Sequence, residues 1–189
     1  MLDSLLHFDQ DLFLYLNGLG SEKWDPFWLF ITNKWGSIPL YFFLLILSIK
    51  AFSKRELLLY LLFIVLLVTF TDQFTNLAKN TFDRLRPCFE PELDGMVRLV
   101  KEGCGYQYGY FSAHATNTFG VALFFISVLG RTYRWMVVPL LLWASVVSYS
   151  RIYVGVHYPL DVFSGIVAGI IIGLIFGKIY FWAKNKLNS

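Results

Sequence analysis

Residues 159–182 read PLDVFSGIVAGIIIGLIFGKIYFW, a run of 24 residues with only two charged side chains, Asp161 and Lys178. A helix rises about 1.5 Å per residue, so a run of this length can cross a bilayer core of about 30 Å. Glycine recurs at every fourth position from Gly165 to Gly177. The stretch therefore predicts a transmembrane helix with a narrow seam for close packing and a carboxylate at its start.

The rest of the chain has the same character. Of its 189 residues, 57% are hydrophobic and 15% are charged, and the mean hydropathy is +0.56, whereas soluble domains have about 25% charged residues. We expect one all-α integral membrane domain over residues 1–189 with about five transmembrane helices. The other four predicted spans are 27–49, which Lys34 interrupts, then 57–79, 113–130 and 135–150.

The N-terminal segment has a weaker, amphipathic pattern. Apolar residues recur at helical spacing from Leu5 to Leu16, and Asp9 and Asp11 are expected on the polar face. Glycines at positions 18 and 20 end the pattern. Residues 1–24 therefore predict a helix that lies in the membrane interface.

Basic residues indicate the orientation in the membrane. The turns after the first, third and fifth predicted spans carry eight basic residues and one acidic residue, Glu56, while the other side carries the remaining eight basic and twelve acidic residues. Because short cytoplasmic turns are enriched in Lys and Arg, we place these turns in the cytoplasm. The N-terminal helix and the long connection then face the periplasm, outside the inner membrane.

The long connection, residues 83–111, is expected to act as an extracytoplasmic lid, since connections of this length are usually functional or disordered. It contains the only two cysteines, Cys88 and Cys104. An even pair in an oxidising compartment predicts a disulfide. Two free thiols remain the alternative.

Polar residues gather beside the ends of the apolar runs. Because charges at membrane depth are costly, such a set predicts a functional site. The alternative for each cation taken singly is a side chain that extends to the lipid headgroups. The set consists of Lys79, Arg86, Ser112, His114, Arg151, His157 and Asp161.

Three sequence blocks hold this set: Lys79-x6-Arg86-Pro87, Ser112-Ala113-His114 and Ser150-Arg151-x5-His157-x3-Asp161. In this order they resemble the signature of the type 2 phosphatidic acid phosphatase (PAP2) superfamily over about residues 72–165. The middle block usually reads Pro-Ser-Gly-His in that family, and many relatives have six spans. The resemblance implies a PAP2-like helical bundle that hydrolyses phosphatidic acid, phosphatidylglycerol phosphate, undecaprenyl diphosphate or lipid A phosphates.

The residue types also suit phosphoryl transfer on chemical grounds. The reaction spreads negative charge over the equatorial oxygens, and Lys79, Arg86 and Arg151 can stabilise that charge. Ser112 and the backbone N–H of Ala113 can complete the phosphate-binding cradle.

The two histidines take complementary roles in this hypothesis. His157 is the candidate nucleophile, which forms a phospho-histidine while Asp161, four residues later, orients its ring. His114 is the candidate general acid, and later the base that activates water.

Further residues are expected to support this set. Asp72 and Asn76 share a helix face with Lys79, Asn117 follows His114 by one turn, and Ser150 precedes Arg151. For Asp72 and Asn117, ordinary hydrogen bonding inside the bundle is an equally strong alternative.

No residues show the spacing of metal ligands, so neither a metal nor another cofactor is expected. The expected partner is a lipid phosphate within the bilayer, not nucleic acid. A non-catalytic protein that binds or transports lipid phosphates remains the competing interpretation. The glycine seam predicts either inward packing or a homodimer face, and the preferred headgroup is open.

Overall fold

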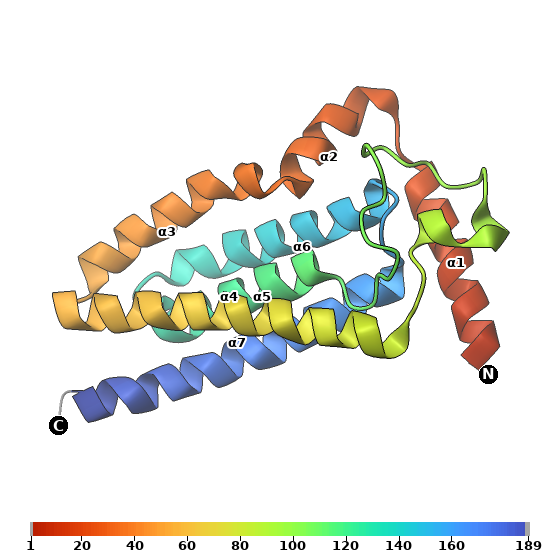
Figure 1. Cartoon of the computed structure of the whole chain (residues 1–189). Helices are drawn as coiled ribbons and strands as arrows, with labels where there is room; N and C mark the ends of the chain where they lie inside the picture. The colour runs from red at the N-terminus through yellow and green to blue at the C-terminus, as the bar shows by residue number, and fades with distance from the viewer. Residues whose placement is uncertain (1, 188–189) are drawn as a thin grey trace.

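The computed structural model describes residues 2–187 and is built from helices (Figure 1), which confirms the predicted all-α class. Within these residues, the only β-type pairing is an isolated bridge between Leu85 and Tyr108. The longer helices are α1 (Leu2–Gly18), α2 (Asp25–Thr32), α3 (Ile38–Ala51), α4 (Lys54–Phe82), α5 (Ala113–Leu129), α6 (Val137–Tyr153) and α7 (Pro159–Leu187). Five short 3-10 turns connect them: η1 (Glu22–Trp24), η2 (Lys34–Ser37), η3 (Pro87–Phe89), η4 (Pro91–Leu93) and η5 (Arg134–Met136).

Four segments are long and apolar enough to cross a membrane, namely Lys34–Ala51, Lys54–Phe82, Arg134–Tyr153 and Pro159–Leu187. The remaining predicted span is α5, which has 17 residues. It packs against α4, α6 and α7 and buries most of its side chains, so it forms the centre of the bundle. The chain is a multi-pass membrane protein.

The first predicted span, 27–49, is not one helix. Asn33 has extended backbone angles, φ −80° and ψ 138°, and its side chain accepts a hydrogen bond from the backbone N–H of Trp35 at 3.1 Å. The chain therefore turns between α2 and α3. Lys34, which interrupts the apolar pattern, lies at this turn. Of the predicted span, only the segment that begins at Lys34 is long enough to cross a membrane.

The glycine seam of α7 packs inward, as one of its two alternatives predicted. A Cβ atom at Gly169 would lie 2.5 Å from the carbonyl oxygen of Thr116, and one at Gly173 would lie 2.5 Å from that of Gly120. Only glycine allows so close an approach of two helix backbones. The seam thus fixes α7 against α5 along their length and holds the start of α7 in place.

α1 lies at one end of the bundle, steeply inclined to the long helices (Figure 1). Its exposed side carries apolar residues, including Phe8 at 62% exposure, as expected for an interfacial helix. However, the prediction that Asp9 lies on the polar, outward face is wrong, because Asp9 is only 4% exposed. Asn17 sets the rotation of α1, since its side-chain amide donates to the carbonyl oxygens of Ile152 and Tyr153.

The two ends of the bundle differ in charge. The end opposite α1 carries the turn before α4, where Ser53 and Glu56 form a capping box. Glu56 also pairs with Lys184 near the end of α7, at 2.8 Å. All eight basic residues of the predicted cytoplasmic turns belong to this half of the molecule, while the polar set belongs to the other end.

Candidate functional site

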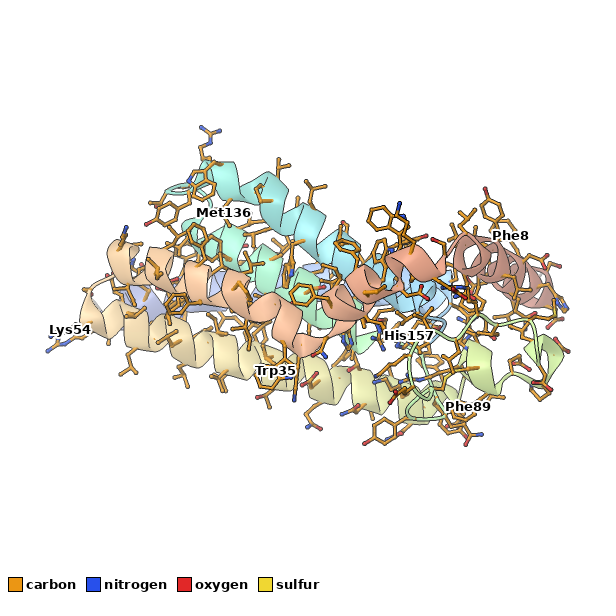
Figure 2. All side chains as sticks on the ribbon, turned by 90° about the horizontal axis from the view of Figure 1, so that it is seen from above. Phe8, Trp35, Lys54, Phe89, Met136 and His157 are labelled. Carbon is orange, nitrogen blue, oxygen red and sulfur yellow. A yellow bond between two sulfur atoms is a disulfide. The ribbon has the colours of Figure 1, made fainter. Side chains whose placement is uncertain are left out.

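The site lies where the ends of four helices meet: the end of α4, the start of α5, the end of α6 and the start of α7. In Figure 2, His157 lies toward the end of the bundle that carries Phe8, whereas Lys54 and Met136 mark the opposite end. Alternating helix direction therefore brings together three sequence blocks that are far apart in the chain. The structure thus gathers the predicted catalytic residues and cations at one end of the bundle.

His157, two residues before α7, forms a buried pair with Asp161 in the first turn of that helix. The Nδ1 atom of His157 lies 3.5 Å from Oδ2 of Asp161, and the two side chains are 3% and 0% exposed. This separation is long for a hydrogen bond, and such contacts tighten when a substrate binds. The same carboxylate oxygen accepts the backbone N–H of Tyr158 at 3.0 Å, which fixes the turn. With Nδ1 directed at Asp161, the Nε2 atom of His157 points away from the carboxylate.

The surroundings of His157 favour its neutral form. Burial, followed by the nearby cations Arg151 and Arg86, holds the pKa of the His157 imidazole well below its usual range. Lys79 contributes in the same direction. A neutral imidazole has a free lone pair, so His157 is suited to nucleophilic attack.

The long connection supports the site as well as covering it. Arg86 is 7% exposed, and its guanidinium donates to the carbonyl oxygens of Tyr108 at 3.2 Å and Cys104 at 2.8 Å. Gly109 sits against the catalytic pair, because a Cβ atom there would lie 3.4 Å from His157 Nδ1. Cys104 is bonded to Cys88, with their Cα atoms 6.3 Å apart. The segment predicted as a lid therefore orients Arg86.

Arg151 and His114 are linked through Thr32 at the end of α2. Nη1 of Arg151 donates to the Thr32 hydroxyl at 2.5 Å, and Nε2 of His114 lies 3.2 Å from the Thr32 carbonyl oxygen. Arg151 is 5% exposed, and its Nε has no hydrogen-bond partner among residues 2–187. His114 also lies within electrostatic range of Arg151 and His157.

Ser112 and Ala113 form the start of α5. The backbone N–H of Ser112 donates to the carbonyl oxygen of Asp161 at 3.0 Å, which ties the two helix starts together. The Ser112 hydroxyl is buried without a hydrogen-bond partner in the described part of the chain. Ala113 takes ordinary helical angles as the first residue of α5, so this turn does not require glycine. Free N–H groups at a helix start are well suited to an anion.

The four supporting residues have different outcomes. Asn117 donates to Asp72 at 2.6 Å and also contacts Thr71, so it joins α5 to α4 and not to the His114 ring. Asn76 is exposed on α4, and Asp72 instead accepts a hydrogen bond from α5. The Ser150 hydroxyl donates to the Val147 carbonyl oxygen of its own helix at 2.6 Å. These three therefore do not orient the catalytic groups directly.

Several residues at the site were missed by the sequence analysis. Arg84 bonds to both Asp9 and Asp161 at 2.6 Å. Thr32 was missed because it lies inside an apolar run. Its position just before the polar pair Asn33-Lys34 could have indicated that it lies near the site. Within residues 2–187, no group of three His, Cys, Asp or Glu side chains has a geometry that could hold a metal ion.

A pocket of about 660 Å³ reaches His114 and Arg151 and is also lined by Lys101. It shares Thr32 and His114 with a smaller pocket of about 210 Å³. The smaller pocket in turn shares Tyr41 and Asn117 with a groove of about 440 Å³ between α3 and α4. Most of the side chains that line this groove are apolar. Polar and apolar spaces therefore adjoin one another from the catalytic end into the membrane-spanning part.

Comparison with known proteins gives a consistent result. Residues 57–185 match the sequence profile of the PAP2 superfamily. The chain is 36% identical over 170 residues to a lipid A 4'-phosphatase of Bacteroides thetaiotaomicron, covering 88% of this chain and 74% of that protein. It is 30% identical over 189 residues to a lipid A 4'-phosphatase of Porphyromonas gingivalis, covering 98% and 78%.

Two solved structures are similar to the chain. The crystal structure of Aquifex aeolicus LpxE has a TM-score of 0.65 at 30% sequence identity and covers 89% of this chain and 93% of that one. A transmembrane PAP2 type phosphatidylglycerolphosphate phosphatase from Bacillus subtilis has a TM-score of 0.69, with coverage of 95% and 87%. At 19% identity, the second similarity concerns the fold.

Proposed function

The chain belongs to the PAP2 superfamily of membrane phosphatases, and from this premise we propose that it removes phosphate from a membrane lipid through a phospho-histidine on His157. The observation that carries the proposal is the buried pair of His157 and Asp161 among three cations. A site that only bound an anion would have no need of a buried carboxylate beside the imidazole. Binding or transport without catalysis is therefore the weaker alternative.

In the first step, Nε2 of neutral His157 attacks phosphorus while Asp161 accepts the Nδ1 proton in a hydrogen bond. The N–P bond forms as the P–O bond to the lipid breaks. His114 donates a proton to the departing oxygen. Arg86 and Arg151 stabilise the charge that develops on the equatorial oxygens.

In the second step, His114 takes a proton from water, and the resulting hydroxide attacks phosphorus. The N–P bond breaks, inorganic phosphate leaves, and His157 returns to its neutral form. Ser112 and the free N–H groups at the start of α5 hold the phosphate oxygens in both steps. Protein cations supply the charge stabilisation, so we expect turnover to persist in the presence of a chelator.

The adjoining pockets support a lipid substrate. The phosphate occupies the polar pocket at His114 and Arg151, and an acyl or prenyl tail lies in the apolar groove between α3 and α4. Relatives named as lipid A 4'-phosphatases make a lipid A phosphate the leading candidate. The basic turns at the opposite end favour a periplasmic site in the inner membrane.

The test is phosphate release by purified protein from lipid A, phosphatidic acid, phosphatidylglycerol phosphate and undecaprenyl diphosphate in detergent micelles, with EDTA present. We expect turnover of at least one lipid phosphate, a preference for long tails over short ones, and none with His157→Ala. Binding without phosphate release from any of these lipids would favour the non-catalytic alternative.

A further inference from the structure

Arg84 joins two carboxylates that are 152 positions apart in the sequence, Asp9 and Asp161. Its Nη1 donates to Oδ1 of Asp161 and its Nη2 donates to Oδ2 of Asp9, both at 2.6 Å. The side chains of Arg84, Asp9 and Asp161 are 17%, 5% and 0% exposed. Buried charges are costly unless they are paired, so the three groups form one unit with alternating charge. That unit ends at His157, because Asp161 also faces the Nδ1 atom.

The same groups hold the backbone of the catalytic turn. Oδ1 of Asp9 accepts the N–H of Leu160 at 2.8 Å. The guanidinium of Arg84 lies over the ring of Tyr158 at 4.3 Å, and Phe13 of α1 packs edge-on against that ring, with centroids 5.4 Å apart. Tyr158 and Leu160, which lie between His157 and Asp161, are therefore held in place by contacts with α1 and Arg84.

We infer that Asp9 and Arg84 are positioning residues for His157, so that α1 is a working part of the catalytic apparatus as well as a membrane contact. This inference rests on the proposed phosphatase function. Because Arg84 pairs with Asp9 as well as with Asp161, its positive charge neutralises Asp161 only in part. The Asp161 carboxylate therefore keeps enough negative charge to accept a hydrogen bond from the Nδ1 proton of His157. The region that matches the family begins at residue 57, so Asp9 lies on an element outside it.

A change in Asp9 is therefore expected to alter catalysis without altering substrate contacts. Asp9→Asn keeps the size of the side chain but removes its charge and one acceptor for Arg84. Asp11→Asn is the matched control, because Asp11 is an exposed acid on the same helix. Kinetic constants of the full-length proteins in detergent are measured with one lipid phosphate over a range of pH.

We expect kcat of Asp9→Asn to fall about 10-fold to 100-fold with KM nearly unchanged, since small misplacements of a catalytic group have effects of this size. The acidic limb of kcat/KM should move to lower pH, because removal of a negative charge lowers the pKa of a nearby imidazolium. Asp11→Asn should match the wild type. The charged and titratable groups around His157 that share in this limb are Asp161, Arg84, Arg86, Lys79, Arg151 and His114.

A second pair of variants separates positioning from simple stability. Asparagine keeps one oxygen that can still accept the Leu160 N–H. If Asp9 acts through Arg84, the double variant Asp9→Asn with Arg84→Met should therefore lose no more kcat than Arg84→Met alone. Normal kcat and an unmoved acidic limb in Asp9→Asn, with or without a lower unfolding temperature, would overturn the inference. Failure of the function itself has a different signature, namely turnover that survives His157→Ala or is absent from the wild type.

Discussion

Thr32→Val removes the one hydrogen bond that the Arg151 guanidinium makes within residues 2–187. The Thr32 hydroxyl accepts from Nη1 of Arg151 at 2.5 Å, and the two residues are 7% and 5% exposed. Valine has the shape of threonine but no acceptor. Since Nε of Arg151 already has no partner among residues 2–187, the variant frees the guanidinium to turn away from the phosphate.

The size of the effect follows from the type of bond. A hydrogen bond to a charged group contributes about 1.5–3 kcal/mol. If that contribution is lost in the transition state, the rate falls about 10-fold to 150-fold. The contact of His114 should survive, because it is made to the backbone oxygen of Thr32. Thr32→Ser, which keeps the hydroxyl, is the matched control and should stay within a few fold of wild type.

The assay is phosphate release from a lipid phosphate in detergent, with kcat and KM measured for both variants and thermal unfolding recorded alongside. We expect a lower kcat for Thr32→Val in a protein that still folds, with an unfolding temperature lowered by about 3–12 °C, because the bond is also lost from the resting protein. A folded Thr32→Val protein with the wild-type kcat/KM would refute the role of Thr32 in holding Arg151.

Three further predictions concern pH, packing and the lid. Because the pKa of His157 is lowered, its neutral form persists as pH falls. The acidic limb of kcat/KM should therefore lie below about pH 6.5, the ordinary pKa of histidine. An acidic limb above that pH would contradict a neutral His157 nucleophile. Gly169→Leu places side-chain atoms against the Thr116 carbonyl oxygen and should abolish folding, whereas Ile171→Leu on the exposed face of α7 should not, as solubility and thermal unfolding will show. Reduction of the bond between Cys88 and Cys104 should cost about 3 kcal/mol of stability and lower the unfolding temperature, and uptake of two thiol labels by the folded, unreduced protein would count against the bond.

The sequence predicted the family and the gathering of the polar set because both depend on features that a chain displays directly. Apolar runs alternate direction through a membrane, so residues at the end of one span and the start of the next must lie on the same side. The match of residues 57–185 to the PAP2 superfamily confirms the family. The pairing of Asp161 with His157 could be predicted in the same way, because the two residues are four positions apart at the start of a predicted helix.

Other features depend on contacts that periodicity does not encode. Asp9 occupies a polar position of an amphipathic helix, but α1 has a second buried face, and the hydrogen bonds of Asn17 to α6 turn Asp9 inward. The turn at Asn33 could not be predicted from the apolar run 27–49, because a hydropathy average over many residues does not detect a single side-chain cap. Arg84 stands within the first block, but the pattern gave no reason to expect a partner from α1.

The nucleophile can be identified by trapping the phosphorylated protein. In His114→Ala, a diphosphate substrate still has a good leaving group, so His157 should accept the labelled terminal phosphate while hydrolysis stalls without its base. Alkaline quench and peptide mass spectrometry should then find the phosphate on His157. Phosphate on a different residue, or full turnover by His157→Ala, would contradict the proposed mechanism.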